Sequence, residues 1–297
     1  MRGLLPLRPP FLARLDTARE LGWRFFRGAR WLGGPGAPPE EFEGHRLYTP
    51  GDDVRWIDWN LFARREEFHV KVFRADEEVE VLIMIDASAS MTGAGVKHET
   101  AAAAGAALAR LALITGHPVR AARYADRLLD VSGSWRSPDD FTRLQRHLGE
   151  QPPPGEGTDL LQALEPLLAG HPRPTSVVAI TDCFQRAPLV SAVAGALARG
   201  VRRIALVRVL DPDDLAPRLR GHTVLLDPEG AGRHALMADR AFEKEARLRI
   251  ADHFVRLRDE CARLGTPLHA LPVREPFEEA LIALLRAGSP TPAPAAA

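Results

Sequence analysis

One segment of the chain, residues 79–85, becomes continuously apolar after Glu80 and ends at Asp86. A strand that is buried on both faces of a parallel sheet has this pattern, because neither of its faces meets water. Residues 176–181 repeat the pattern and end before Asp182. Helical and strand-like patterns alternate around these two segments: helices are predicted over residues 97–115, 138–148, 158–169 and 188–198, and strands over 119–124, 203–209 and 268–271. This alternation predicts an α/β domain with a doubly wound, mostly parallel sheet.

A long helix is predicted before the last of these strands. Its apolar residues recur at helical spacing, and they are Ile250, Phe254, Leu257, Cys261 and Leu264. Such a stripe faces the core of a domain, so Cys261 is interpreted as a core residue.

Residues 11–32 alternate apolar side chains with arginines, which is typical of a basic amphipathic helix. The favoured interpretation is a helix that covers the domain surface and keeps its arginines in water. A peripheral membrane contact or a partner contact through residues 11–32 is the alternative, because basic amphipathic helices serve both uses.

The chain is predicted to have four parts. Residues 1–39 form the basic helix and a linker rich in glycine and proline, and residues 40–78 form a small β segment packed on the main domain. Residues 79–287 form the α/β domain, and residues 288–297 form a disordered tail.

Composition narrows the classes of function. The 297 residues hold 39 Lys and Arg against 39 Asp and Glu, so the basic surplus of a non-specific nucleic-acid binder is missing. Two cysteines are too few for a disulfide-stapled scaffold or a four-cysteine zinc site. No stretch is apolar enough for a secretory leader or a membrane span, so a cytoplasmic protein is expected, possible membrane association aside.

Oxygen-bearing side chains cluster where the two buried strands end. Asp86, Ser88 and Ser90 alternate along the loop after the first strand, Asp182 follows the second, and Thr158 opens a helix. Because ligands bind beyond the carboxyl ends of parallel strands, these side chains are expected to converge. Few carboxylates with several hydroxyls suit a hard divalent cation, Mg²⁺ first and Mn²⁺ or Ca²⁺ as alternatives. An open coordination position on such an ion would attract an external carboxylate.

This pattern resembles the metal-ion-dependent adhesion site of the von Willebrand factor A-like fold, which is of the Rossmann type. That site combines an Asp-x-Ser-x-Ser loop with a distant Thr and a distant Asp, and Asp86, Ser88, Ser90, Thr158 and Asp182 fill every position. The resemblance implies that Ser88 and Ser90 bind the ion directly and that Thr158 binds it directly or through water. Asp86 and Asp182 would hold coordinated waters or bind it directly. Many such domains have Gly after the last Asp, whereas this chain has Cys183 and Phe184.

A second motif lies upstream. Residues 46–60, RLYTPGDDVRWIDWN, followed by Ala63-Arg64 and by Val70-Lys71-Val72-Phe73, resemble the signature of the bacterial family called domain of unknown function 58. That family joins this segment to a von Willebrand A-like domain. The resemblance implies an adaptor that works with a MoxR-type AAA+ ATPase in assembling or remodelling complexes. The chain has no phosphate-binding loop of its own, which agrees with the ATPase being a separate chain.

Several other residues invite a functional interpretation. Asp52 and Asp53 could be paired catalytic carboxylates, but the preceding Pro-Gly makes an ordinary turn the better reading. Cys183 could be a nucleophile, but buried thiols are common at strand ends. His98 is predicted at the surface. Arg55, Asp58 and Arg64 are expected to form ion pairs that lock the β segment to the sheet.

Two functions from different classes compete. The first is a non-enzymatic, metal-dependent interaction module that captures an acidic side chain of a protein partner. The second is a magnesium-dependent phosphohydrolase, in which an Asp after the first strand is the nucleophile. Phosphatases of the haloacid dehalogenase type place a second Asp two residues later, and Ser88 stands there instead. The residues therefore favour the interaction module.

Overall fold

The computed structural model describes residues 7–27, 41–49, 57–74, 79–93, 96–150, 157–170, 173–184, 189–217, 219, 221–227, 232–273 and 276–287. The chain divides into two compact units, one of Met1–Arg30 with Val79–Ala297 and one of Trp31–Glu78. Some sequence predictions fall outside the described residues, namely the linker 33–39, Asp52, Asp53, Arg55 and the tail 288–297.

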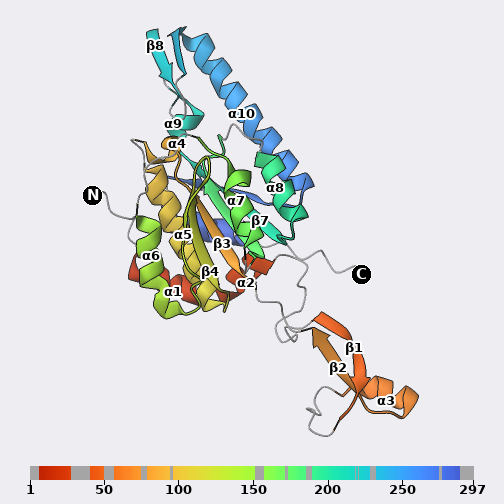
Figure 1. Ribbon diagram of the computed structural model, residues 1–297. Helices are drawn as coiled ribbons and strands as arrows, with labels where there is room; N and C mark the ends of the chain where they lie inside the picture. Colours follow the sequence, from red (N-terminus) through yellow and green to blue (C-terminus); the bar gives the residue numbers. More distant parts are fainter. Residues whose placement is uncertain are drawn as a thin grey trace. The chain divides into compact units, whose positions relative to one another are not determined.

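A six-stranded sheet forms the centre of the larger unit (Figure 1). Its order is β10-β7-β6-β3-β4-β5, and every neighbouring pair is parallel except β4 with the edge strand β5. The strands are β3 (Val81–Asp86), β4 (Val119–Tyr124), β5 (Leu128–Val131), β6 (Ser176–Thr181), β7 (Arg203–Leu210) and β10 (Leu268–Pro272). From β3 the chain winds outward through β4 in one direction and through β6 in the other. The predicted doubly wound, mostly parallel α/β fold is confirmed.

Two hydrophobic clusters cover the two faces of this sheet. Val81, Ile83 and Ile85 of β3 belong to one cluster, and Leu82 and Met84 belong to the other. The alternation explains the continuous apolar run, because successive side chains of a strand point to opposite faces. On the first face lie α1 (Pro9–Thr17), α2 (Arg19–Arg27), α5 (Lys97–Ile114), α6 (Phe141–Gly149) and α11 (Phe277–Ala287). On the second face lie α7 (Leu160–Ala169), α8 (Leu189–Ala198) and α10 (Arg240–Arg263).

Helix α5 is buried along almost its whole length. Its alanines allow the backbone to approach β3, and a Cβ at Gly105 would lie only 3.0 Å from Ile85 Cδ1. The prediction that His98 lies at the surface is wrong, because α5 is covered on all sides and His98 is 6% exposed. Burial lowers the pKa of His98, and the positive charge of Arg123 lowers it further.

The N-terminal basic segment forms two helices, α1 and α2, that meet at Ala18. Phe11, Leu15, Phe25 and Phe26 are buried in the first hydrophobic cluster. The predicted surface-covering role is thus confirmed for the described residues 11–27, although the helix is broken.

The smaller unit contains β1 (Glu41–Leu47), α3 (Trp59–Arg65) and β2 (His69–Arg74), and its two strands are antiparallel. Helix α3 was not expected in this β segment. Asp58 explains it, because its carboxylate caps the helix by accepting hydrogen bonds from the N–H groups of Asn60 and Leu61. Asp58 also contacts His45 Nε2 at 2.9 Å within the same unit.

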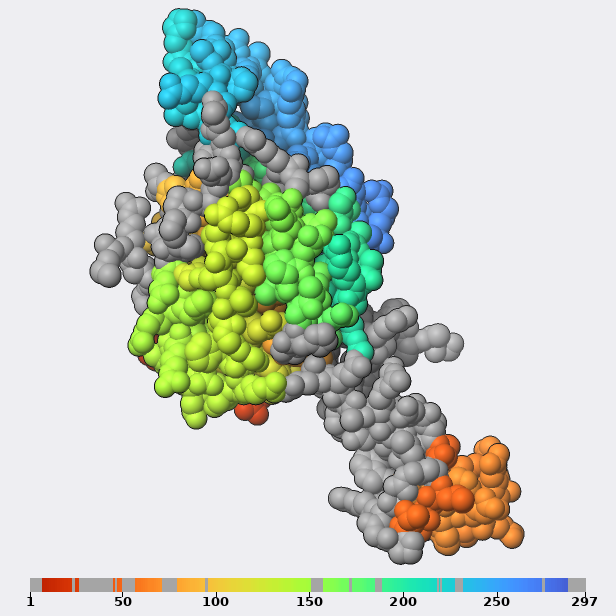
Figure 2. Space-filling model, in the orientation of Figure 1, coloured from red at the N-terminus to blue at the C-terminus, as the bar shows by residue number. Residues whose placement is uncertain are grey.

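The remaining elements are short or lie at the periphery of the larger unit. They are α4 (Ala89–Thr92), a 3₁₀ turn (Pro138–Asp140), α9 (Pro212–Leu215) and the hairpin of β8 (Gly221–Leu226) with β9 (Arg233–Ala238). Figure 2 shows this hairpin at one end of the unit, beside the beginning of α10. Further along α10, Phe254, Leu257 and Cys261 are buried, as the apolar stripe predicts.

Candidate functional site

Asp86 ends β3 and is fully buried. Its Oδ1 accepts a hydrogen bond from the Ser88 backbone N–H at 2.8 Å. Its Oδ2 accepts one from the hydroxyl of Thr181, the last residue of β6, at 2.7 Å. The carboxylate therefore joins the ends of two neighbouring strands.

Ser88 and Ser90 lie at the start of α4. The common role of a serine at such a position is to cap the helix, but the Ser88 side chain makes no capping hydrogen bond. Its Oγ lies 3.0 Å from Ser90 Oγ instead. The two hydroxyls therefore converge, as the alternation of residues in this loop predicts.

Thr158 is buried and lies just before Asp159, the residue that caps α7. Asp159 caps α7 by accepting a hydrogen bond from the Gln162 N–H, and its own N–H donates to the Ala125 carbonyl at 2.8 Å. The loop after β3 is held in a similar way, since the N–H of its residue Ala87 donates to the carbonyl of Tyr124, the last residue of β4. The loops that follow β3 and β4 and the loop that carries Thr158 thus meet at one edge of the sheet.

Asp182 follows β6 and is 3% exposed. Its Oδ1 accepts from the Phe184 N–H at 3.2 Å, which closes a tight turn. Cys183 inside this turn has φ 65°, in the left-handed region that glycine adopts most easily. The chain thus keeps the backbone shape that a glycine would give, although Cys183 stands there.

The electrostatics of the two carboxylates indicate a shortage of positive charge beside Asp86. Burial raises the pKa of Asp86 to about 7, and the nearby Asp182 charge adds to the effect, while hydrogen bonds from Thr181 and Ser88 oppose it. A buried carboxylate that keeps its proton up to neutral pH is one that a cation would stabilise. The two carboxylates and the neighbouring hydroxyls therefore fit a hard divalent ion.

No group of three or more His, Cys, Asp or Glu side chains that could hold a metal lies among the described residues. The predicted ligand set is of another kind, since it has two carboxylates and three hydroxyls. Asp86, Ser88, Ser90 and Asp182 would hold an ion from the ends of β3 and β6, and Thr158 would approach it from the loop before α7.

Sequence reasoning missed three residues at this site: Thr181, Lys97 and Asp214. Lys97 Nζ donates to Asp182 Oδ2 at 2.9 Å and to Asp214 Oδ2 at 3.0 Å. Burial lowers the pKa of Lys97, but the two carboxylates outweigh burial and the net shift is upward. One signal was available, because Lys97 is one of three lysines in the chain and begins an alanine-rich helix.

The surroundings of Cys183 disfavour a role as a nucleophile. Its side chain is buried, and burial, together with the Asp182 charge, raises the pKa of the thiol well above its ordinary value. His253 lies nearby, but its Nε2 is 3.1 Å from the Cys183 carbonyl oxygen. The histidine therefore holds the backbone of the loop, and the thiol has the surroundings of an unreactive buried cysteine.

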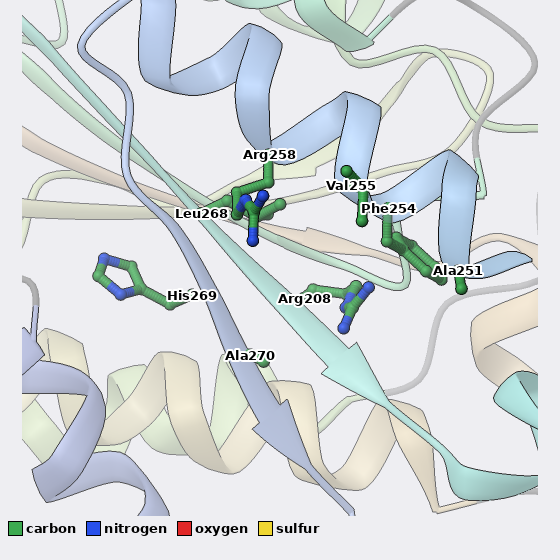
Figure 3. A pocket seen from close by; sticks show the side chains of 8 residues that line it. All are labelled: Arg208, Ala251, Phe254, Val255, Arg258, Leu268, His269 and Ala270. Carbon is green, nitrogen blue, oxygen red and sulfur yellow. The ribbon is translucent and has the colours of Figure 1, made fainter.

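A pocket of about 240 Å³ lies at the outer edge of the sheet, where β10 meets α10 (Figure 3). The Arg208 guanidinium carbon lies 3.8 Å from the centre of the Phe254 ring on one side of β10. His269 points to the other side of that strand, and its ring centre is 5.8 Å from that of Phe25. Neither Asp86 nor Asp182 lines this pocket.

Comparisons with known proteins bear on the family. The family model described as "Protein of unknown function DUF58" matches residues 44–258. Uncharacterized proteins of Mycobacterium bovis and Mycobacterium tuberculosis are 29% identical over 248 residues, which are 80% of this chain and 75% of each relative.

Two solved structures are similar in outline. An aerotolerance-related membrane protein from Bacteroides fragilis is 16% identical, and the match covers 71% of this chain and 98% of that one with a TM-score of 0.41. A von Willebrand factor type A structure from Catenulispora acidiphila is 15% identical, with coverages of 73% and 43% and a TM-score of 0.40. Among the residues that the structure describes here, no helix is both long and apolar enough to cross a membrane.

Proposed function

We propose that this chain, which belongs to the DUF58 family of proteins of unknown function, is a non-enzymatic adaptor that binds an acidic side chain of a partner protein through a divalent cation. The observation that carries the proposal is the meeting of Asp86, Ser88, Ser90 and Asp182 at one edge of the sheet. Mg²⁺ is the proposed ion, with Mn²⁺ or Ca²⁺ as alternatives.

The neutral and the charged side chains of the proposed ligand set have different roles. Ser88, Ser90 and Thr158 offer neutral oxygens, so only Asp86 and Asp182 bring negative charge to a divalent cation. When bound, the ion would supply an open coordination position to a carboxylate of the partner. Asp86 and Asp182 hold the two loops in place through their hydrogen bonds to Ser88, Thr181 and Phe184.

The burial of Asp86 favours an adaptor over a phosphohydrolase. A nucleophilic carboxylate must attack the substrate with an oxygen of its own, whereas Asp86 is fully buried and each of its oxygens already accepts a hydrogen bond, so Asp86 suits contact with an ion through coordinated water better than attack on a substrate. Ser88 also lacks the acidic proton that the second carboxylate of such an enzyme provides.

The proposed partner is a MoxR-type AAA+ ATPase or one of its client proteins, as the family resemblance implies. The larger unit has the layered α/β architecture that the resemblance predicts for the adaptor. A membrane contact through residues 11–32 stays a prediction. Among the described side chains of this segment, Arg14 and Arg19 are exposed, whereas the apolar residues Phe11, Leu15, Phe25 and Phe26 are buried in the domain.

Binding of the purified MoxR-type ATPase of the same organism tests the proposal. We expect the dissociation constant measured by biolayer interferometry to rise at least about tenfold when EDTA replaces Mg²⁺, because the bridging ion is lost. Ser88→Ala and Thr158→Ala should weaken binding in the same way. Thr115→Ala removes a hydroxyl from the far end of α5 and serves as the matched control.

Two results would count against the proposal. Binding that is indifferent to EDTA and to Asp86→Ala would exclude a metal-bridged contact. Magnesium-dependent phosphatase turnover that disappears in Asp86→Asn would favour the enzyme instead.

A further inference from the structure

Lys97 places a positive charge directly on one of the proposed metal ligands. Its ammonium group contacts Asp182 Oδ2 at 2.9 Å and Asp214 Oδ2 at 3.0 Å. The side chains of Lys97 and Asp182 are 10% and 3% exposed, whereas that of Asp214 is 31% exposed. The lysine thus links the buried site to a partly exposed carboxylate on α9.

We propose that the Lys97 ammonium is a built-in cation that competes with a divalent metal for Asp182 and thereby sets how tightly the site binds metal. This inference rests on the proposed function, because it takes Asp182 as a metal ligand. It adds a residue that the ligand motif does not contain.

The position of Lys97 in its helix shows that the carboxylates hold it there. Lys97 is the first residue of the 18-residue helix α5. The N-terminus of a helix carries a partial positive charge, which disfavours a cation. A largely buried ammonium also loses most of its hydration. Its contacts with Asp182 and Asp214 offset both costs. The attraction of the two carboxylates therefore keeps the ammonium group at this site.

Competition follows from the geometry of Asp182. Its Oδ1 accepts from the Phe184 N–H, and its Oδ2 accepts from Lys97. A metal ion that approached Asp182 would meet the ammonium at the same carboxylate, and two cations repel each other strongly where water is scarce. Metal binding therefore requires the ammonium to move away or to tolerate this repulsion.

Asp214 gives the displaced ammonium a place to remain. A lysine side chain has a flexible four-carbon stem and a compact charge, so it can loosen one contact and keep another. With metal present, Lys97 would stay on Asp214 and release Asp182. With metal absent, it would stay in contact with both carboxylates. The site thus has two states, one in which Lys97 contacts Asp182 and one in which a metal ion does, and the metal concentration selects between them.

Titration of the full chain with Mn²⁺, followed by the electron paramagnetic resonance signal of free Mn²⁺, tests the inference. Lys97→Gln keeps a donor for Asp182 but removes the charge, and Lys97→Met removes both. We expect each variant to bind Mn²⁺ at least about tenfold more tightly than the unmodified protein. Lys97→Arg keeps the charge and is the matched control, with an affinity within about threefold of the unmodified protein.

Two further variants locate the effect. Ser88→Ala added to Lys97→Gln should remove the gain in affinity, because it deletes a proposed ligand of the same ion. Asp214→Asn should weaken Mn²⁺ binding, because the ammonium would lose its alternative partner. Thermal unfolding of each variant with and without Mn²⁺ reports folding, and added Mn²⁺ should raise the melting temperature of Lys97→Gln more than that of Lys97→Arg.

The outcomes separate this inference from the proposed function. Equal, measurable Mn²⁺ affinities in the unmodified protein and in Lys97→Gln would overturn the competition and leave the metal site standing. Binding by Lys97→Gln but not by the unmodified protein would support the competition, while it would overturn the metal-dependent function of the natural chain. No binding by any variant would overturn both.

Discussion

Lys97 and Arg208 are both cationic side chains that this fold removes at least in part from water, yet their surroundings differ. Lys97 lies at the carboxyl edge of the sheet and contacts two carboxylates. Arg208 lies beside β10 under α10, where its guanidinium faces the Phe254 ring and its Nε makes no hydrogen bond with any described residue. Burial lowers the pKa of Arg208, and no carboxylate of the described residues forms a salt bridge with it.

A third basic group, His269, responds in another way. It is 8% exposed, and its Nε2 has no hydrogen-bond partner in the part of the chain that the structure describes. Burial, assisted by the charge of Arg203, lowers its pKa to about 4, so His269 stays neutral in the folded protein. A histidine can give up its proton near neutral pH, whereas an arginine cannot. The comparison teaches that the charge of Lys97 is paired with carboxylates at the candidate site, whereas at the outer edge of the sheet charge is avoided at His269 and has no carboxylate partner among the described residues at Arg208.

Loss of the Asp182 carboxylate is expected to have the largest effect on stability. Asp182→Ala leaves the buried Lys97 with Asp214 alone, and removing one partner of a buried pair costs about 3–5 kcal/mol in the free energy of unfolding. Urea denaturation at pH 7 in EDTA measures this cost. Asp259→Ala breaks the exposed contact with Arg258 and is the control, with an expected cost below about 1 kcal/mol. Similar losses in the free energy of unfolding for the two variants would show that the buried contact of Lys97 with Asp182 stabilises the fold no more than an exposed ion pair does.

The next largest effect is the pH dependence of the free energy of unfolding that His269 causes. As pH falls from about 6.5 toward 4, the unfolded chain binds a proton at this histidine while the folded chain does not. Stability is therefore lost over that range, by about 3 kcal/mol near pH 4, and the effect is absent above pH 6.5. His269→Gln should remove this part of the loss in urea titrations. His222→Gln, at an exposed histidine of β8, should leave the profile unchanged.

The same contrast shows how far the sequence alone can go. The buried strands and the residues that follow them were predictable, because the apolar runs before Asp86 and Asp182 are local patterns. Lys97 meets Asp182 across 85 positions, and no local pattern records such a contact. His98 was placed at the surface because it is polar, but the packing of α5 against the sheet and its neighbouring helices decided otherwise.

Elements outside the main sheet were also harder to predict. Helix α3 and the β8–β9 hairpin have few buried side chains, so their hydrophobic periodicity is weak. The cap formed by Asp58 is the clearest sequence signal for α3, and it was interpreted as an ion-pairing residue.

The turn between Asp182 and Phe184 connects the two regions, because His253 of α10 binds the Cys183 carbonyl. Cys183 has φ 65°, a conformation that costs a side-chain-bearing residue about 1–2 kcal/mol. Cys183→Gly should therefore be more stable than Cys183→Ala by about 0.5–1 kcal/mol, once the greater freedom of glycine in the unfolded chain is counted. The same two variants at Cys261, inside helix α10, should show the opposite order by about 1 kcal/mol. Thermal unfolding of the four variants checks the signs, and a preference for alanine at both positions would contradict the assigned turn.

The smallest effect is expected at Arg208. In chelator, Lys97→Met should cost about 3–5 kcal/mol, because it leaves Asp182 buried without its counter-charge. Arg208→Met makes a similar chemical change where no carboxylate depends on the cation, and methionine also packs well on an aromatic ring. The lost attraction between the guanidinium and the Phe254 ring is offset by relief of the burial of an unpaired charge, so stability should change by less than about 1 kcal/mol. Urea denaturation of the two variants side by side measures the difference. A large loss in Arg208→Met would mean that the guanidinium has an anionic partner that the present structure lacks.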